Sequence, residues 1–182
     1  MELKETVIGS ETIFRGKIVT LRVDRIKLPD GSESKREIVE HKGAVCIVPV
    51  REDGMVLMTR QFRLAAGKPL LEVPAGTLED GEAPEVCAAR ELEEETGYKA
   101  GSLRPLFNAY VSPGYDTEQI RAYLATGLTP GQTHTDPDEN VEIVPIPLAE
   151  IEEMVLKGEI EDSKTISALL LALRLLPQPL RS

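Results

Sequence analysis

The chain has no tryptophan, and aromatic residues make up only 4% of its 182 positions. A surface on which nucleotide bases stack must therefore use few candidates, and the hydrophobic core is expected to be aliphatic. Positive charge is also scarce, because 21 Lys and Arg face 31 Asp and Glu for a net charge of -10. No broad basic surface for nucleic acid is expected, whereas a small phosphorylated substrate stays compatible if metal ions and single arginines reverse the local field.

Cysteine and long hydrophobic runs are scarce as well. Cys46 and Cys87 both lie in apolar surroundings and lack zinc-ligand spacing, which favours buried free thiols and a reducing compartment. No apolar run approaches membrane-spanning length, and the N-terminal sequence MELKETVIGS lacks a basic region followed by an apolar one. We therefore expect a soluble, cytoplasmic protein without a membrane partner, built as one domain or as one domain with a small appendage.

Alternating apolar and polar residues predict a β-hairpin near the N-terminus. Residues 14–27 form the expected first strand, LPDGSES supplies a turn, and REIVEHKG begins the second strand. Such an arm is too long for a simple sheet edge, and its apolar residues need a surface to cover. We predict an N-terminal β arm over residues 1–43 that forms a homodimer and is open to exchange between subunits.

Residues 44–176 are predicted to form one mixed α/β domain, followed by a C-terminal tail at 177–182. The apolar run AVCIVPV at 44–50 has the length of a buried strand. Further strands are expected at 55–62, 70–73, 103–111, 118–126 and 141–146. Helices are expected at 148–157 and 162–176, the second buried either as a core helix of a monomer or also against a neighbouring subunit. Strands interleaved with helices predict an α/β/α sandwich around a mixed sheet.

One further helix is expected inside the segment GTLEDGEAPEVCAARELEEETGY at residues 76–98. Pro84 suits a first helical turn and Gly97 suits a helix end, so the helix is predicted from about residue 82 to residue 96. The face of this helix that can pack inward carries Ala88, Ala89 and Leu92. A neighbouring face carries several glutamates, and this face is where chemistry is expected.

Three glutamates share that acidic face, because Glu91 lies three residues before Glu94 and four before Glu95. Most charge runs are solvated faces. Here, however, the acids crowd the C-terminal end of the helix, where the macrodipole disfavours anions and like charges repel by about 0.2–0.5 kcal/mol per pair. Carboxylate oxygens suit hard divalent cations such as Mg²⁺ or Mn²⁺, so the pattern favours a metal site.

The same segment resembles the signature of the Nudix hydrolases. It follows the spacing G-x5-E-x7-R-E-U-x-E-E-x-G-U, in which U is a bulky apolar residue, with every fixed position filled. The resemblance covers roughly residues 44–176. It implies a mixed-sheet α/β/α sandwich and the hydrolysis of a diphosphate linked to another moiety. The fixed positions are Gly76, Glu82, Arg90, Glu91, Leu92, Glu94, Glu95, Gly97 and Tyr98.

The resemblance also implies roles for the residues of the signature. Glu91 and Glu95 would bind the metal, which is expected to be Mg²⁺ with Mn²⁺ or Zn²⁺ as substitutes. Glu94 would support this ligation, and Ala75 would contribute its backbone carbonyl oxygen. Arg90 would hold the glutamates in place through charge-assisted hydrogen bonds.

Three features are similar to the subfamily that hydrolyses ADP-ribose. A proline lies about fifteen residues beyond the signature, here Pro113 in VSPGYDTE, although SPG is also an ordinary tight turn. The segments RQFR at 60–63 and LLEVPAG at 70–76 also resemble that subfamily. The implied reaction converts ADP-ribose to AMP and ribose 5-phosphate. The residues placed at the substrate are Arg60, Arg63, Glu72, Pro113 and Gly114, with the guanidinium of Arg63 on the diphosphate.

The resemblance leaves the base and the adenine site less defined. The base is expected on a late loop, where Glu139 in THTDPDENVEIV aligns best and Glu142 is the second candidate. Relatives hold the adenine between aromatic residues of two N-terminal arms. Because this chain has no tryptophan, Phe14, Ile18 or an arginine plane would replace them, in a homodimer with shared active sites.

Two alternative functions remain. The chain could hydrolyse another nucleoside diphosphate derivative, such as a sugar nucleotide, FAD or a dinucleoside polyphosphate. It could also be a noncatalytic nucleotide sensor, but such a protein is expected to have a broken REUxEE core, and the core here is intact.

Overall fold

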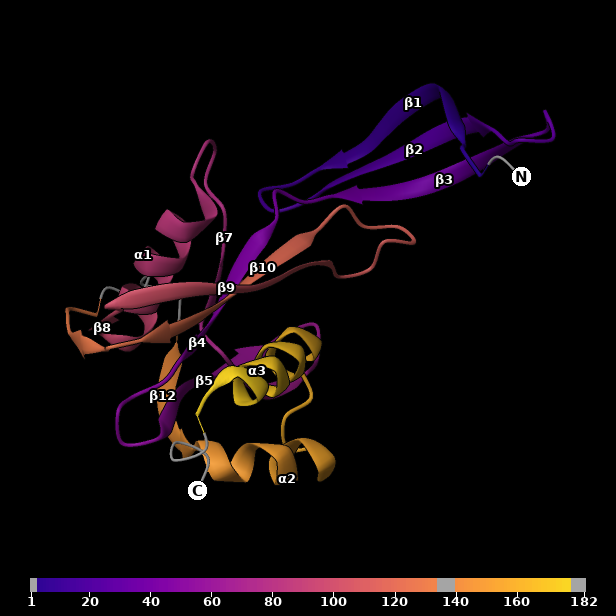
Figure 1. Cartoon of the computed structure of the whole chain (residues 1–182). Coiled ribbons are helices and arrows are strands. Elements are labelled where there is room, and N and C mark those ends of the chain that lie inside the picture. The colour runs from indigo at the N-terminus through magenta and orange to yellow at the C-terminus, as the bar shows by residue number, and fades with distance from the viewer. Residues whose placement is uncertain (1–2, 134–139, 178–182) are drawn as a thin grey trace. The chain divides into compact units, whose positions relative to one another are not determined.

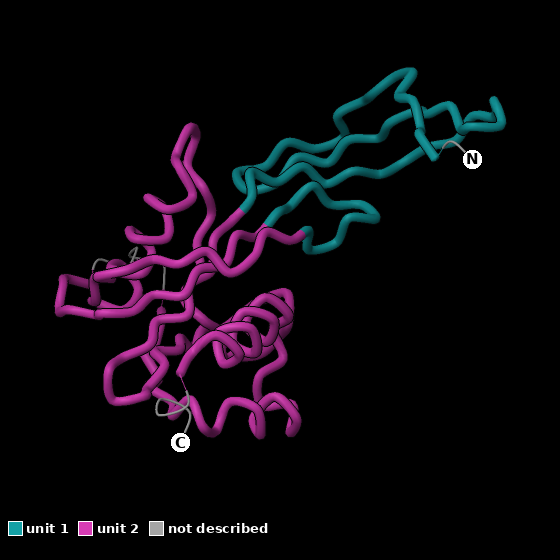
Figure 2. Tube along the Cα trace, viewed as in Figure 1, with its two compact units in different colours: residues 1–43, 110–119 teal, residues 44–109, 120–182 magenta. Residues whose placement is uncertain are grey.

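The computed structural model describes residues 3–133 and 140–177 of the chain, which divides into two units. Figure 2 colours them separately: unit 1 comprises residues 1–43 and 110–119, and unit 2 comprises residues 44–109 and 120–182.

Unit 1 contains a three-stranded antiparallel sheet in the order β1-β2-β3 (Figure 1). Its strands are β1 (Thr6–Arg15), β2 (Thr20–Lys27) and β3 (Glu33–Glu40). The predicted hairpin is present as β2 and β3, but the expectation of one strand over 14–27 was wrong. The chain turns near Gly16, whose N–H donates to the carbonyl of Val19 at 2.9 Å. Residues 14 and 15 therefore end an additional strand.

Unit 1 also includes the loop at residues 110–119. This loop is hydrogen-bonded to the end of β3, because Val39 N–H donates to the Tyr115 carbonyl at 2.7 Å and Thr117 N–H donates to the Val39 carbonyl at 3.0 Å. The side chain of His41 lies beside Glu118, with 3.6 Å between Nδ1 and Oε1. Residues far apart in the sequence thus build one unit.

Unit 2 contains a four-stranded sheet in the order β7-β4-β10-β9 and a three-stranded sheet in the order β12-β5-β6. Strand β4 pairs with β10 in parallel and with β7 antiparallel, so the first sheet is mixed. A short pair, β11-β8, completes the strands of the described residues. The bounds are β4 (Ala44–Pro49), β5 (Met55–Arg63), β6 (Lys68–Glu72), β7 (Ala75–Thr77), β8 (Tyr98–Lys99), β9 (Ser102–Tyr110), β10 (Gln119–Thr126), β11 (Thr129–Pro130) and β12 (Val141–Pro147).

The helices of unit 2 follow the capping signals in the sequence. Helix α1 (Pro84–Thr96) begins at a proline and ends at Gly97, whose φ of 72° is the left-handed conformation that favours glycine. A short 3₁₀ turn (Leu148–Glu150) leads into α2 (Ile151–Leu156). Helix α3 (Ser163–Leu175) is capped by Asp162, whose side chain accepts a hydrogen bond from the N–H of Thr165.

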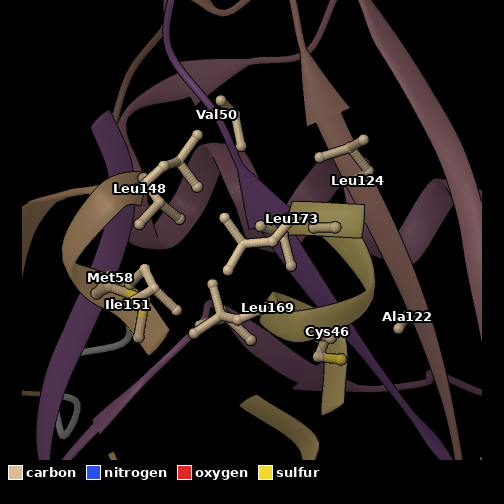
Figure 3. Packing of buried hydrophobic residues seen from close by; sticks show 14 of the residues in the cluster. Cys46, Val50, Met58, Ala122, Leu124, Leu148, Ile151, Leu169 and Leu173 are labelled. Atoms are coloured by element: carbon tan, nitrogen blue, oxygen red, sulfur yellow. The ribbon is translucent and has the colours of Figure 1, made fainter. Parts of the chain in front are cut away.

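The helices pack on opposite faces of β4, because successive side chains of a strand point to opposite sides. Val45 and Ile47 join one buried cluster with Cys87, Ala88 and Leu92 of α1. Cys46 and Val48 join the other cluster with residues of α3 and the second sheet. Figure 3 labels Cys46 together with Leu169 of α3 and Met58 of the second sheet. The predicted α/β/α sandwich with a mixed sheet is therefore present.

Details of the helix packing differ from the sequence expectation. Ala89 was predicted to point inward but is exposed. Cys87 is buried on the inward face in its place. Helix α3 buries one stripe that includes Ala168 and Leu169, whereas Leu170 is 41% exposed. Burial of that outer side against another subunit stays a prediction.

Cys46 and Cys87 are free, fully buried thiols, and burial raises the pKa of each to about 12. Such thiols carry almost no thiolate at neutral pH and act as small apolar core residues. Among the described residues, no helix is long and apolar enough to cross a membrane.

Candidate active site

Arg90 lies at the centre of the acidic face of α1. Its Nε and Nη2 donate to the two carboxylate oxygens of Glu82 at 3.0 and 3.1 Å, and its Nη1 donates to Glu91 at 2.7 Å and to Glu94 at 3.0 Å. One guanidinium therefore binds three carboxylates. These hydrogen bonds, that to Glu82 above all, raise the pKa of Arg90 and keep it charged. The predicted contact between Arg90 and the glutamates is thus present in the structure.

Glu91 and Glu95 both reach the first residues of β7. The carboxylate of Glu91 lies so close to Gly76 that a Cβ built there would be 1.9 Å from it. Oε2 of Glu95 accepts a hydrogen bond from the N–H of Ala75 at 3.3 Å, and Glu95 is only 7% exposed. The strand–loop–helix unit thus brings two carboxylates to the start of one strand.

A divalent cation at the start of β7 would need oxygen ligands from the residues around it. No group of three His, Cys, Asp or Glu side chains between residues 3–133 and 140–177 is arranged to hold a metal ion. Arg90 engages both Glu91 and Glu94, so only part of the acidic face is available. Mg²⁺, however, usually binds one or two protein carboxylates and takes its other ligands from waters and substrate phosphates. Glu91 and Glu95 fit that donor set.

A second charged group lies at the end of β6. Nε and Nη2 of Arg63 donate to the two oxygens of Glu72 at 2.7 and 3.0 Å. Lys164 of α3 donates to Glu72 at 2.5 Å and to Asp162 at 2.9 Å. Burial works to raise the pKa of Glu72, but hydrogen bonds from Arg63 and the charge of Lys164 outweigh it and lower the pKa below its ordinary value. Glu72 is therefore a buried carboxylate held by two cations.

Arg60 does not join the group around Glu72 and is paired with Glu142 instead. The two residues face each other on the antiparallel strands β5 and β12, and Nη1 of Arg60 donates to Glu142 at 3.0 Å. Both side chains are exposed. Glu139, the preferred candidate for the base, lies outside the described residues, so only its alternative, Glu142, has a described position.

The remaining predicted substrate residues lie in unit 1. Ile18 lies between β1 and β2 and is 65% exposed. Pro113 and Gly114 lie in the loop whose neighbour Tyr115 is hydrogen-bonded to β3. Every other described residue of the predicted site belongs to unit 2.

Two residues of this charged group, Lys164 and Asp162, were not predicted from the sequence. Lys164 lies 92 positions from Glu72, and no local spacing connects the two. The only sequence signal is Asp162 as an N-cap before an apolar helix, and this signal predicts a helix start without indicating a site.

Two family models together match most of the chain. Residues 40–169 match the NUDIX domain, and residues 5–39 match the nucleoside diphosphate sugar hydrolase N-terminal domain. The chain belongs to the Nudix family. The resemblance seen in the sequence is therefore confirmed.

Known proteins resemble this Nudix chain over nearly its whole length. An ADP-ribose pyrophosphatase of Bacillus subtilis (strain 168) is 42% identical over 169 residues, which cover 92% of this chain and 91% of the relative. A methanol dehydrogenase activator of Bacillus methanolicus is 41% identical over 167 residues, covering 91% and 90%. The crystal structure of an ADP compounds hydrolase has a TM-score of 0.87 at 25% identity and covers 100% of both chains. The family match and this similarity confirm the predicted fold class.

Glu82 of the Nudix signature is expected to contribute to the stability of the fold in a way that depends on pH. Its hydrogen bond from Arg90 and, next, that from the N–H of Glu79 lower its pKa from 4.5 to about 2. A carboxylate with a lowered pKa stabilises the fold above its unfolded pKa, and this contribution disappears as the pH falls towards the folded pKa. We expect the difference in unfolding free energy between wild type and Glu82→Gln to shrink between about pH 5 and about pH 3 in denaturant titrations. A difference that stays constant over this interval would contradict the assignment.

Proposed function

We propose that the chain hydrolyses the diphosphate of ADP-ribose, with a divalent cation, to AMP and ribose 5-phosphate. The convergence of Glu91 and Glu95 on Ala75 and Gly76 at the start of β7 supports the chemistry and is the observation that carries it. The substrate is supported by the relative of Bacillus subtilis, which is named an ADP-ribose pyrophosphatase and is 42% identical over 92% of this chain.

Glu91 and Glu95 are proposed to hold the cation, with Glu94 in support, and Ala75 to add its carbonyl oxygen. Nudix hydrolases generally use a divalent metal; here we propose Mg²⁺, with Mn²⁺ or Zn²⁺ as substitutes. The cation would polarise phosphoryl oxygens and lower the pKa of an attacking water. Arg90 holds Glu91 and Glu94 in place, because its guanidinium donates hydrogen bonds to both.

The substrate and the water are assigned to other residues. Arg63 is proposed to contact the diphosphate, because a planar guanidinium matches phosphate oxygens. Glu72 is proposed to orient Arg63, to which it is hydrogen-bonded. Arg60, Pro113 and Gly114 are proposed as further substrate contacts on the basis of the resemblance. Glu139 is proposed as the base that accepts the proton of the water, with Glu142 as the second candidate. The ion pair between Glu142 and Arg60 gives Glu142 another partner, which supports this order.

Comparison of substrates tests the proposal. Steady-state kcat/KM with Mg²⁺ would be measured for ADP-ribose, ADP-glucose, GDP-mannose, NADH and FAD. ADP-ribose is expected to give the highest value. A higher value for GDP-mannose or FAD would assign a different Nudix substrate, and binding of ADP-ribose without turnover would favour a nucleotide sensor.

We further propose a homodimer formed through unit 1. Large exposed apolar residues are candidates for an interaction surface, and unit 1 has several of them. Those that precede β2 are Leu3, Val7, Ile8, Ile13, Phe14 and Ile18, which are 77, 56, 41, 53, 57 and 65% exposed. Phe14 and Ile18 remain the proposed substitutes for the aromatic residues that hold adenine in relatives. The free thiols of unit 2 support a reducing, cytoplasmic compartment.

Deletion of residues 1–40 is expected to give a monomer with impaired ADP-ribose hydrolysis. The deletion removes the whole sheet of unit 1 and its exposed apolar residues but keeps the Nudix signature. KM should rise most and kcat should fall less, because the carboxylates of α1 remain. Size-exclusion chromatography with light scattering and steady-state kinetics would be run together.

A variant with three surface substitutions provides a second test of the N-terminal β arm. Val7→Ser, Ile13→Ser and Phe14→Ser combined should also give a monomer while keeping the sheet, since all three side chains are exposed. Dimers with an unchanged KM in both variants would refute the proposed role of the arm.

A further inference from the structure

The first turn of α3 contacts the end of β6 at two places. Nζ of Lys164 lies 2.5 Å from Oε2 of Glu72. One residue further along each segment, the buried Thr165 accepts a hydrogen bond from the N–H of Val73 at 3.0 Å. Asp162 completes the turn, because its side chain accepts from both Lys164 and the N–H of Thr165. Glu72 and Val73 lie only a few residues before Ala75 and Gly76 of β7.

The carboxylate of Glu72 connects Lys164 to Arg63, because it accepts hydrogen bonds from both. The Glu72 side chain is 3% exposed, whereas that of Arg63 is 41% exposed. Arg63 uses its Nε and Nη2 on Glu72. Within residues 3–133 and 140–177, its Nη1 has no hydrogen-bonding partner. Because the guanidinium is rigid and planar, the position of the Glu72 carboxylate decides where this free edge points.

We infer that Lys164 is a positioning residue, which fixes the carboxylate of Glu72 and thereby aims the free edge of Arg63 at the diphosphate of the substrate. The inference rests on the proposed function, in which Arg63 contacts that diphosphate. Without Lys164, Arg63 would be the one cation of the described residues still bound to the carboxylate of Glu72, and the two groups could rotate together. Arg63 would then lose its preorganised direction, and substrate binding would weaken.

A purely structural ion pair is the competing explanation, because breaking a buried pair also lowers stability. The two explanations predict different kinetics. A positioning role acts through Arg63 and disappears once Arg63 is gone. A structural role lowers stability whether or not Arg63 is present. A double-mutant cycle separates them.

The experiment compares Lys164→Met, Lys164→Arg, Arg63→Ala and the double variant Lys164→Met with Arg63→Ala. Lys164→Met is expected to fold, because the contacts of Thr165 with Val73 and Asp162 do not involve the ammonium group. It should raise KM about tenfold and change kcat less than about threefold. Lys164→Arg should keep KM within about threefold of wild type, since it restores a cation beside Glu72. In the Arg63→Ala background, Lys164→Met should add less than about a twofold change in KM.

Lys68→Met is the matched control. Lys68 also pairs with a glutamate of unit 2, Glu161, but both side chains are about half exposed. Because exposed pairs contribute little, its KM should stay within about twofold of wild type. Calorimetric binding of AMP without metal gives a second readout, and its affinity should fall for Lys164→Met but not for Lys68→Met.

An unchanged KM in Lys164→Met, or an equal increase in the Arg63→Ala background, would overturn the inference. If Lys164→Met shows no cooperative thermal transition, Lys164→Gln is judged by the same criteria. If the wild type hydrolyses another substrate of the panel instead of ADP-ribose, the proposed substrate fails and the cycle is repeated with that substrate, because the diphosphate is shared. If Arg63→Ala leaves KM unchanged, the proposed contact of Arg63 with the diphosphate and the positioning role of Lys164 are both contradicted.

Discussion

Glu95→Gln is expected to keep the fold and lose nearly all hydrolytic activity. Glu95 is 7% exposed and accepts a hydrogen bond from the N–H of Ala75. Glutamine has nearly the same size and keeps an acceptor oxygen, so packing and this hydrogen bond survive. The negative charge that would hold the cation is lost. Stabilisation by a bound metal is worth several kcal/mol, so kcat should fall by roughly 10²- to 10³-fold or more.

Glu85→Gln is the matched control for this variant. Glu85 lies in the first turn of the same helix, and its side chain is exposed. The same chemical change there should leave kcat near the wild-type value. Far-UV circular dichroism and the Tm would be recorded for both variants, and turnover would be measured at saturating Mg²⁺. Near-native turnover by Glu95→Gln would show that Glu95 does not hold the cation.

Gly76→Ala is expected to abolish most activity through Glu91. The added Cβ would lie 1.9 Å from the carboxylate of Glu91, far closer than atoms can approach. The φ of Gly76 is not positive, so the backbone accepts alanine without strain. The flexible glutamate must move instead, which should preserve the fold and displace a metal-binding carboxylate. We expect kcat/KM to fall about 100-fold and the concentration of Mg²⁺ for half-maximal activity to rise.

A double variant checks this explanation. If Gly76→Ala acts by moving Glu91, combining it with Glu91→Gln should cost little more than Glu91→Gln alone. Fully multiplicative losses would show that the two changes act independently. Wild-type activity in Gly76→Ala alone would contradict the close approach itself.

The sequence predicted those helices and strands whose ends or periodicity are marked by their own residues. Pro84 and Gly97 mark the ends of α1 because each has backbone preferences that suit those positions. Strand β1 was missed because register shifts near Gly9 and Phe14 interrupt its alternation. Strands β7, β8 and β11 have two or three residues each, which is too short for any periodicity. Their pairing depends on neighbours that the fold supplies.

The candidate site also has features that the sequence predicts and features that only tertiary contacts determine. Glu91 and Glu95 lie one helical turn apart, so their shared face follows from the sequence. The approach of Glu91 to Gly76 depends on how α1 packs beside β7, and no spacing gives that distance. Arg63 and Glu72 were both predicted at the substrate, but their mutual pairing and the contribution of Lys164 come from tertiary contacts. Arg60 was predicted beside the substrate, and its cross-strand partner Glu142 was not foreseen.

The most direct test of the central claim is product analysis of ADP-ribose incubated with the purified protein, with Mg²⁺ in one sample and with a chelator in the other. Phosphorus NMR and liquid chromatography would identify and quantify the products. Cleavage of the diphosphate should give AMP and ribose 5-phosphate in equal amounts, in the Mg²⁺ sample alone. Intact ADP-ribose in the Mg²⁺ sample, or equal hydrolysis in the chelator sample, would contradict the account.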